Sequence, residues 1–436
     1  MDKNEIIKIL EDWNFWSKDM DTGIDRDLYL GVLKKMLADE QIKVITGARR
    51  CGKSFIMRQL AKCLIDGGAS KSNILIVNFE DPRFVGLDTK LLGQIFDTYL
   101  EYQAPQGKMY VFLDEVQEIP KWEKWVRTMQ ELGKANMIVS GSNSKLLSGE
   151  LATVLTGRHL DTTVLPLSLA EFLNFKNIQI KDNSEFTRNE IKVKSLLVEF
   201  VELGSFPLVV LGQDKEKILL AYFDDVINKD LIKRYKIRKS EEIKSLVKFY
   251  LSNISCSITF TSAGKFLNMA ALSAKRFSAY LEASYLMFFL KRFSFKFKEQ
   301  ERSPRKVYAI DTGLANVVGF RFSGNSGKLA ENAVFLELKR RSYFNPQMEI
   351  YYWKSRDQEE VDFVVKENAN IKQLIQVCWD MQDINTKKRE IKALAKAMDE
   401  FDLKAGLIIT QDYEAEENYR GKKIRYTTLI KWLLGL

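Results

Sequence analysis

The sequence predicts an α/β protein that begins with a parallel β-sheet covered by helices on both faces and continues into smaller domains. Two observations predict the sheet. The β-branched strand from Lys43 to Thr46 runs directly into a glycine-containing loop and a helix, and the apolar strand from Met109 to Leu113 ends in two acidic residues. A third observation predicts a separate C-terminal α/β domain, because a helix, three strands, a helix and a further strand follow Gly327. With 436 residues, the chain exceeds what one hydrophobic core usually serves.

Composition limits the classes of protein that fit this chain. Hydrophobic residues make up 46% and charged residues 29%, which is ordinary for a soluble globular protein. No apolar stretch is long enough to cross a bilayer and the N-terminus is acidic, so we expect a cytoplasmic protein without membrane contact. Four cysteines without a C-x-x-C pair and one histidine, His159, argue against a structural zinc and against Ser-His or Cys-His hydrolases. The net charge of +9 suits contact with nucleic acid or another polyanion.

The first strand, loop and helix have the pattern of a phosphate-binding loop. The loop reads G-A-R-R-C-G-K-S, and the helix after it carries Ile56, Leu60 and Leu64 on one face. Backbone N–H groups of such a loop cradle the β-phosphate, the lysine contacts the β- and γ-phosphates, and the serine ligates magnesium. The sequence therefore predicts binding of ATP with Mg²⁺ by Gly47, Ala48, Arg49, Arg50, Cys51, Gly52, Lys53, Ser54 and Phe55.

The acidic pair Asp114 and Glu115 supplies the second half of this predicted site. The pair stands at the C-terminal end of a strand with hydrophobic residues on both faces, and ligands bind at that edge of a parallel sheet. We expect Asp114 to hold the metal together with Ser54. We expect Glu115 to orient and deprotonate the attacking water.

Further stretches of the first 170 residues strengthen this interpretation. They are V-N-F-E-D at 77–81, F-L-D-E-V-Q at 112–117, V-S-G-S-N-S at 139–144, L-T-G-R at 155–158 and L-P-L-S at 165–168. With the phosphate-binding loop, they make the chain resemble the AAA-type ATPases of a bacterial and archaeal group in which the ATPase core precedes a C-terminal domain of unknown function.

The resemblance implies roles for additional residues. Asn78 would hold Glu115 in an inactive rotamer until a ligand or partner binds, and Ser142 and Asn143 would sense the γ-phosphate. Arg158 would act as an arginine finger, in cis or, in an oligomer, from a neighbouring subunit. Turn chemistry at strand ends is the alternative reading of Asn78, Ser142 and Asn143, and a surface ion pair is the alternative for Arg158.

Changes in pattern divide the chain into five segments. Residues 1–36 form a helical lead-in, residues 37–172 the ATPase core, and residues 173–239 a helical lid or connector. Residues 240–322 form a winged helix, and residues 323–436 a domain that resembles the restriction-endonuclease-like fold.

Residues 240–322 carry three helical patterns followed by strands. The alternation of Phe293, Phe295 and Phe297, together with the run from Val307 to Ile310, predicts a two-stranded wing. The third helix would enter the major groove of DNA, and basic residues of the helix and wing would contact phosphates. The basic residues predicted for DNA contact are Lys275, Arg276, Lys291, Arg292, Lys296 and Lys298. The alternative is a module that only packs beside the ATPase.

The C-terminal domain retains part of a nuclease motif. In the restriction-endonuclease-like family, an acidic residue of the first helix, an aspartate of the second strand and E-x-K of the third form the active site. Glu331 and Asp362 match the first two, whereas Gln376 and Cys378 occupy the last two positions. Because a neutral amide and a thiol replace the carboxylate and the ammonium, we expect no nuclease catalysis.

Three functions fit these observations. The leading one is an ATP-hydrolysing switch whose C-terminal half binds nucleic acid or a protein partner. The alternatives are an ATP-dependent nuclease that uses Glu331 and Asp362, and a nucleotide-regulated binding module with negligible hydrolysis.

Overall fold

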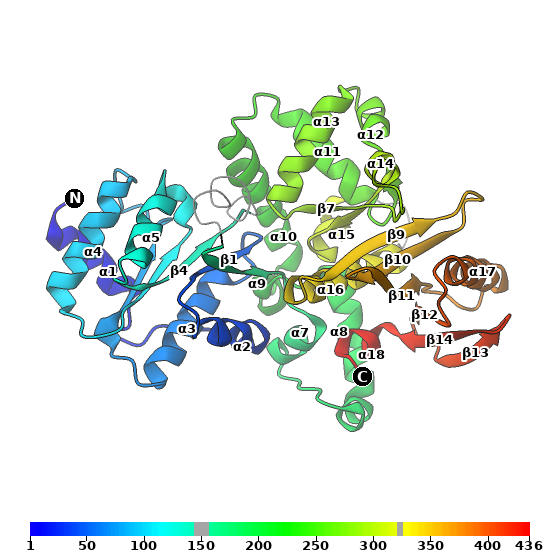
Figure 1. The fold of residues 1–436 in the computed structure, drawn as a ribbon, viewed down its shortest axis with the longest axis horizontal. Coiled ribbons are helices and arrows are strands. Elements are labelled where there is room, and N and C mark those ends of the chain that lie inside the picture. Colours follow the sequence, from blue (N-terminus) through cyan, green and yellow to red (C-terminus); the bar gives the residue numbers. More distant parts are fainter. Residues whose placement is uncertain (144–156, 321–325) are drawn as a thin grey trace. The chain divides into compact units, whose positions relative to one another are not determined.

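The computed structural model describes residues 1–143, 157–320 and 326–436. The chain divides into two compact units, Met1–Val164 and Leu165–Leu436 (Figure 1). The boundary that we predicted between residues 322 and 323 lies outside the described residues. Within the described ranges, every helix is too short or too polar to span a membrane.

The first unit is built on a five-stranded parallel sheet with the strand order β2-β3-β4-β1-β5, which confirms the predicted fold class. Its strands and main helices are α1 (Lys3–Trp13), α2 (Asp27–Met36), β1 (Ile42–Gly47), α3 (Lys53–Asp66), β2 (Ile74–Asn78), α4 (Thr89–Gln103), β3 (Tyr110–Asp114), α5 (Trp122–Glu131), β4 (Asn136–Gly141) and β5 (His159–Val164). Short 3₁₀ turns occupy Lys71–Asn73 and Val116–Glu118.

Alternation along the strands explains why helices cover both faces of this sheet. Val44, Leu113 and Val139 join a core cluster with residues of α1 and α4 on one face. Their neighbours along the strands, such as Ile45 and Phe112, point to the opposite face and are equally inaccessible to solvent. Strands that are apolar on both faces require two layers of helix.

The N-terminal segment covers the outer edge of the sheet at β2. The Asn14 side chain donates to the carbonyl of Ile76 (2.9 Å) and accepts from the Ile76 amide (2.7 Å), as a neighbouring strand would. The Trp16 indole donates to the carbonyl of Ile74 (2.8 Å). Because β2 is an edge strand, these side chains satisfy backbone groups that would otherwise be unpaired.

The second unit begins with helices. They are α7 (Leu169–Phe175), α8 (Asn183–Leu203), α9 (Pro207–Leu211), α10 (Lys215–Asp225), a π-helical segment (Val226–Lys233) and α11 (Ser240–Ser252). A small three-stranded antiparallel sheet, β6-β8-β7, follows with its own helices. Its elements are β6 (Ser257–Ile258), α12 (Phe260–Phe266), α13 (Ala271–Ala283), β7 (Met287–Leu290), α14 (Phe297–Arg302), β8 (Arg305–Ala309) and α15 (Thr312–Val318).

The prediction of the first strand of the wing is wrong. β7 ends at Leu290, before the alternating phenylalanines begin, and Phe297 starts the helix α14. Phe293 lies outside the small sheet. Its amide donates to the carbonyl of Tyr352 (2.6 Å), and its ring packs in the core of the C-terminal domain. The run F-K-E-Q-E-R contains mainly good helix formers, so the charged residues after Lys296 favour a helix over a strand.

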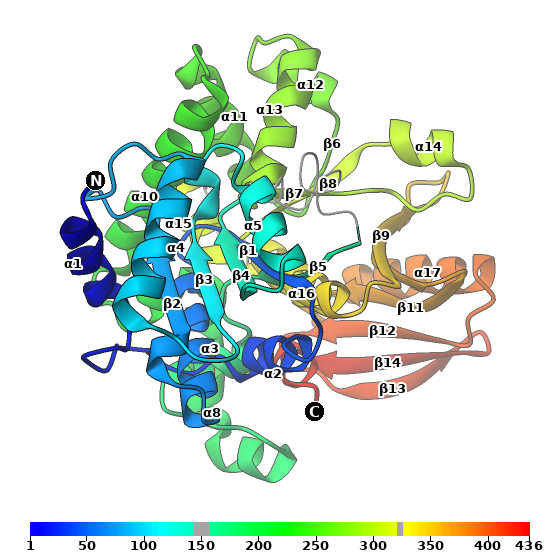
Figure 2. The ribbon, with the colours of Figure 1, turned by 60° about the vertical axis from the view of Figure 1, so that its left-hand side comes forward.

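The C-terminal domain is a six-stranded mixed sheet with the order β13-β14-β12-β11-β10-β9, and α17 packs against one of its faces (Figure 2). This confirms a separate C-terminal domain with a mixed sheet. The elements are α16 (Ser326–Phe344), β9 (Met348–Lys354), β10 (Glu360–Glu367), β11 (Asn370–Val377), α17 (Ile384–Glu400), β12 (Ala405–Thr410), β13 (Ala415–Tyr419), β14 (Lys422–Thr428) and α18 (Leu429–Leu434). The hairpin of β13 and β14 and the helix α18 extend the predicted order.

Candidate functional site

The loop between β1 and α3 has the backbone conformation of a tight phosphate-binding turn. Gly47 has φ +141° and Gly52 has φ +94°, and Arg50 between them also adopts a positive φ of +68°. A Cβ atom on Gly47 would lie 2.1 Å from the carbonyl oxygen of Val164, so no other residue fits there. Both glycines of the motif are therefore required by the geometry of the loop.

Lys53 starts α3 and is 4% exposed. Its Nζ donates to the carbonyl oxygens of Gly47 (3.3 Å) and Ala48 (3.2 Å), and it lies 3.4 Å from Oε1 of Glu115. The ammonium thus sits within the loop, where neutral carbonyls and a distant carboxylate hold it. Such weak contacts leave room for a phosphate oxygen to replace Glu115 at the ammonium.

Asp114 lies at the end of β3, beside the start of α3. Its carboxylate accepts a hydrogen bond from the Ser140 hydroxyl of the adjacent strand β4. Burial and the neighbouring Glu115 raise the pKa of Asp114, whereas hydrogen bonds from Ser140 and Ser54 lower it. The structure therefore brings together the two residues predicted to hold the metal, Ser54 and Asp114.

Both carboxylate oxygens of Glu115 are engaged. Oε1 faces Lys53, and Oε2 accepts from Nε2 of Gln117 (2.5 Å). Glu115 itself has φ +51°, an uncommon value for a residue with a side chain. The other amide atom of Gln117, Oε1, is buried without a hydrogen-bond partner among the described residues. The hydrogen bond from Gln117 thus holds the Glu115 carboxylate in place, while Oε1 of Gln117 has no hydrogen-bond partner among the described residues.

The residues predicted to assist Glu115 occupy the same sheet edge, but with different contacts. Asn78 pairs in register with Asp114, yet its Oδ1 accepts from the amide of Glu80 (2.9 Å), which is turn chemistry. Ser142 and Asn143 follow β4 and are 1% and 6% exposed. Their roles as switch and sensor stay predictions.

Arg158 lies at the N-terminal ends of the strands, away from the loop that follows β1. β5 runs parallel to β1, with His159 opposite Ile42 and Val164 opposite Gly47. Since Arg158 precedes β5, roughly 17 Å of strand separates it from the loop that follows Gly47, at about 3.3 Å per residue. Its guanidinium instead pairs with Glu131. Arg158 therefore does not serve the loop of its own unit, and only the role in trans stays a prediction.

Two arginines outside the sequence motifs bear on the site: Arg26 contacts the loop, and the charge of Arg58 interacts with Asp114. Arg26 is 2% exposed and donates from Nη1 to the carbonyl of Cys51 (2.7 Å). Arg58 stands one helical turn after Ser54. Burial lowers the pKa of Arg58, and the charge of Asp114 offsets part of that lowering. The spacing of Arg58 on the helix was a usable signal, whereas nothing in the sequence connects Arg26 with the loop.

The chemistry of these groups fits a nucleoside triphosphate with Mg²⁺. A buried ammonium and a turn with two positive-φ glycines suit phosphate oxygens, and the hydroxyl of Ser54 beside the carboxylate of Asp114 supplies the hard oxygen ligands that Mg²⁺ prefers. Arg49, whose guanidinium pairs with Glu80 (2.7 Å), adds positive charge to the same loop.

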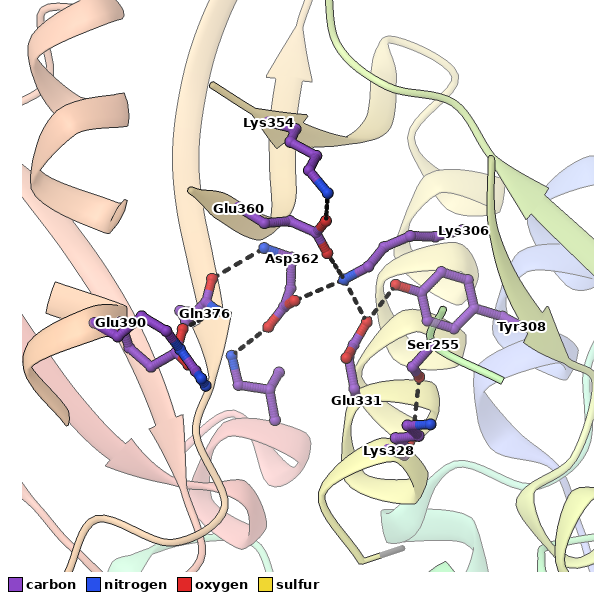
Figure 3. Close-up of polar contacts among 12 residues, drawn as sticks. Ser255, Lys306, Tyr308, Lys328, Glu331, Lys354, Glu360, Asp362, Gln376 and Glu390 are labelled. Carbon is purple, nitrogen blue, oxygen red and sulfur yellow. Dashed lines mark hydrogen bonds and ion pairs between the residues drawn. The ribbon is translucent and has the colours of Figure 1, made fainter. Parts of the chain in front are cut away.

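A second group of buried charges lies in the C-terminal domain (Figure 3). Glu331 on α16 and Asp362 on β10 approach each other as predicted, but Lys306 of β8 stands between them, 2.9 Å from Oε1 of Glu331 and 2.7 Å from Oδ1 of Asp362. Burial, and then Asp362, raise the pKa of Glu331 to about 8. Gln376 accepts from the Asp362 amide (3.0 Å). In the sequence, Cys378 stands where E-x-K has its lysine, and no motif indicates that Lys306 of β8 lies at this position instead.

Mg²⁺ does not fit this second group as it stands. Across residues 1–143, 157–320 and 326–436, no three or more acidic, histidine or cysteine side chains are arranged to hold a metal ion. The ammonium of Lys306, which is 2% exposed, fills the space between the carboxylates.

The basic residues predicted for DNA contact fall into two groups. Lys275 and Arg276 on α13 and Lys296 and Lys298 near α14 are exposed. Lys291 and Arg292 have internal partners, because Lys291 pairs with Glu301 and the Arg292 guanidinium donates to the carbonyl of Lys354.

Comparison with known proteins agrees with this arrangement of a nucleotide site followed by C-terminal domains. Residues 39–173 match the AAA domain family, and residues 194–325 and 326–430 match two domains of unknown function, DUF8612 and DUF4143. An uncharacterized protein of Methanocaldococcus jannaschii is 35% identical over 389 residues, which cover 87% of this chain and 82% of the relative. An uncharacterized protein of Haemophilus influenzae is 28% identical over 420 residues, 94% of this chain and 98% of the relative.

Two solved structures align with part of this chain at low similarity. The Walker-type ATPase of Pyrococcus abyssi aligns over 68% of this chain and 96% of its own, with 12% identity and a TM-score of 0.41. AMPPCP-bound DnaA of Aquifex aeolicus aligns over 62% of this chain and 93% of its own, with 13% identity and a TM-score of 0.28. On the sequence matches and the site geometry, the chain belongs to the AAA-type P-loop ATPases in which the ATPase domain precedes C-terminal domains of unknown function.

Proposed function

We propose that this protein binds ATP with Mg²⁺ and hydrolyses it slowly, as a switch whose C-terminal half engages a nucleic acid. The observation that carries the first part is the meeting of Lys53, Ser54 and the pair Asp114–Glu115 at one edge of the sheet. Membership of the AAA-type ATPases supports the same activity.

Each residue of this edge has a distinct task in the proposal. Lys53 and the loop amides hold the phosphates, and Ser54 with Asp114 holds Mg²⁺, which neutralises developing charge when bound. Glu115 accepts the proton of the attacking water. In the resting arrangement Lys53 and Gln117 occupy the Glu115 carboxylate, so hydrolysis requires these contacts to change. That requirement suits slow, regulated turnover at this site.

Phosphate release tests the catalytic part. Lys53→Ala should abolish nucleotide binding and hydrolysis. Glu115→Gln should retain binding of a fluorescent ATP analogue but lose hydrolysis by about a hundredfold or more, in the range seen when a catalytic group is removed. Equal rates in wild type and both variants would refute hydrolysis at this site. Binding without measurable turnover by the wild type would instead favour the nucleotide-regulated binding module.

Exposed basic side chains in the second unit support the nucleic-acid part. Arg276 lines a cleft of about 380 Å³ together with Lys236 and Arg238, and Lys275 is its exposed neighbour on α13. We assign the module of α11 to α13 and the β6-β8-β7 sheet to the winged-helix class, with α13 as the helix that contacts DNA. Phosphate contacts of this kind weaken steeply as salt rises.

A salt-titrated binding assay with double-stranded DNA tests this part. The double variant Lys275→Ala/Arg276→Ala should weaken binding at low salt by about tenfold and flatten its salt dependence. Lys90→Ala, at an exposed lysine of α4 in the other unit, is the matched control and should bind as wild type does. Retained ATP hydrolysis without DNA affinity at low salt would replace nucleic acid with a protein partner.

The role of Arg158 is part of the same proposal. Since Arg158 lies about one strand length from its own loop, it can act as an arginine finger only in an oligomer. Hydrolysis per chain should then increase with protein concentration, and Arg158→Ala should remove that increase. A rate per chain that is independent of concentration in the wild type would refute the role in trans.

A further inference from the structure

The second group of charges contains three carboxyl groups around the buried ammonium of Lys306 (Figure 3). Nζ of Lys306 lies 2.9 Å from Glu331, 2.9 Å from Glu360 and 2.7 Å from Asp362. The carboxylates come from α16 and β10, and the ammonium comes from β8 of the preceding small sheet. Each of the three donor protons of Lys306 therefore has a carboxyl oxygen as its partner.

Other groups hold each carboxylate independently of Lys306. The hydroxyl of Tyr308 donates to Oε1 of Glu331 (2.7 Å), and the amide of Val377 donates to Oδ2 of Asp362 (2.9 Å). Lys354 lies 3.4 Å from Oε2 of Glu360. Removal of the ammonium would therefore leave three carboxylates that still point toward one place.

The space occupied by the ammonium has the chemistry of a divalent-cation site. Three carboxylates of different segments converge on it, and hard divalent cations prefer such oxygen ligands. The nitrogen–oxygen distances are longer than the roughly 2.0–2.6 Å of Mg²⁺ or Ca²⁺ to oxygen. The present spacing therefore suits an ammonium, and inward movements of about 0.1–0.9 Å, depending on the ion, would suit a metal ion.

We infer that the cluster of Glu331, Glu360 and Asp362 is a cation site in which the chain's own Lys306 takes the place of a divalent metal ion. The site is self-sufficient, because the cation is covalently part of β8 and cannot be removed by a chelator. Lys306 excludes a metal ion from this cluster while it remains in place. The ion pairs of Lys306 also connect β8 of the small sheet with α16 and β10 of the C-terminal domain.

Mn²⁺ binding to nucleotide-free protein tests this inference. The variant Lys306→Met keeps an unbranched stem for packing but removes the charge. It should gain one Mn²⁺ per chain, at least about tenfold tighter than any Mn²⁺ bound by the wild type, as a tenfold change in Kd is readily resolved by calorimetry. The double variant Lys306→Met/Asp362→Asn should lose that ion. Lys354→Ala is the matched control, since it removes a nearby lysine but leaves Lys306 in place, and it should gain none.

Two results would overturn the inference. One is wild-type protein that binds Mn²⁺ in a manner abolished by Asp362→Asn, since Lys306 would then not exclude metal. The other is a folded Lys306→Met variant that gains no Asp362-dependent Mn²⁺. If Lys306→Met proves unstable, its thermal unfolding with and without Mn²⁺ decides the matter, because an ion bound only by the folded state raises the unfolding temperature. No such rise would equally overturn the inference. None of these measurements depends on ATP hydrolysis, so they stand apart from the proposed function.

Discussion

Two buried lysines in this molecule are held in opposite ways. Lys53 of the nucleotide loop contacts two backbone carbonyls and has the Glu115 carboxylate 3.4 Å away. Lys306 of the C-terminal cluster has three carboxylates within 2.9 Å. The two side chains are almost equally buried, at 4% and 2% exposure. Burial alone therefore does not distinguish a lysine proposed to bind phosphate from a lysine held by carboxyl groups.

The difference lies in how completely the charge is neutralised. A buried ammonium held mainly by neutral dipoles favours any anion that arrives, which suits the phosphates of a nucleotide. A buried ammonium surrounded by carboxylates has nothing to gain from a new partner. Lys53 is arranged to exchange its partner, whereas Lys306 is arranged to keep its partners.

The largest effect should appear when the two lysines are removed in turn. Lys306→Met leaves the buried Asp362 and the half-buried Glu331 and Glu360 without their common cation and should cost about 3–5 kcal/mol of unfolding free energy in the second unit. Lys53→Met removes weaker contacts and should cost about 1 kcal/mol. Urea unfolding followed by circular dichroism, with EDTA present, measures both. Equal costs would break the comparison.

A smaller effect should appear in the pH dependence of stability. The pKa of Glu331 is raised to about 8 by burial and by Asp362, so the folded protein retains a proton that the unfolded chain has released. Stability therefore falls as pH rises toward and through that value. Between pH 6 and pH 9 the wild type should lose on the order of 2 kcal/mol more than Glu331→Gln, which cannot titrate. A Glu331→Gln variant with the same pH profile as wild type would contradict the shift.

The smallest effect should come from the contact that restrains Glu115. Gln117→Ala removes the donor to Oε2 and should raise basal ATP hydrolysis about threefold through kcat, or roughly 0.7 kcal/mol, without a change in KM. Gln106→Ala is the control, since the exposed Gln106 side chain donates to the carbonyl of Ala104, and the variant should leave the rate unchanged. Steady-state phosphate release gives both constants. A loss of rate in Gln117→Ala would show that Gln117 assists Glu115 instead of restraining it.

The nucleotide edge could be predicted because its parts are local. The loop from Gly47 to Ser54 is one continuous segment, and Asp114 and Glu115 end the strand two positions away in the sheet. In a parallel sheet all carboxyl ends meet at one edge, so sequence order alone brings these residues together. The same argument could have placed Arg158 at the opposite edge, since it precedes its strand.

The Lys306 cluster could not be predicted in this way. Its members come from β8, α16 and β10, and no motif spacing connects a lysine of one small sheet with carboxylates of another domain. The E-x-K pattern places its lysine on the third strand, where Cys378 stands in this chain. The helix α14 was missed for a different reason, because the alternating phenylalanines mimic a strand while the charged residues after Lys296 favour a helix.

The N-terminal cover of β2 has a practical consequence for anyone who isolates the nucleotide-binding part. The AAA family match begins at residue 39, after the segment that contains Asn14, Trp16 and Arg26. A fragment cut at that boundary would expose the backbone of Ile76 on a bare sheet edge, where a second copy could add a strand. It would also lose the guanidinium that supports the Cys51 carbonyl. Poor solubility of such a fragment would reflect the truncation and not the intact protein.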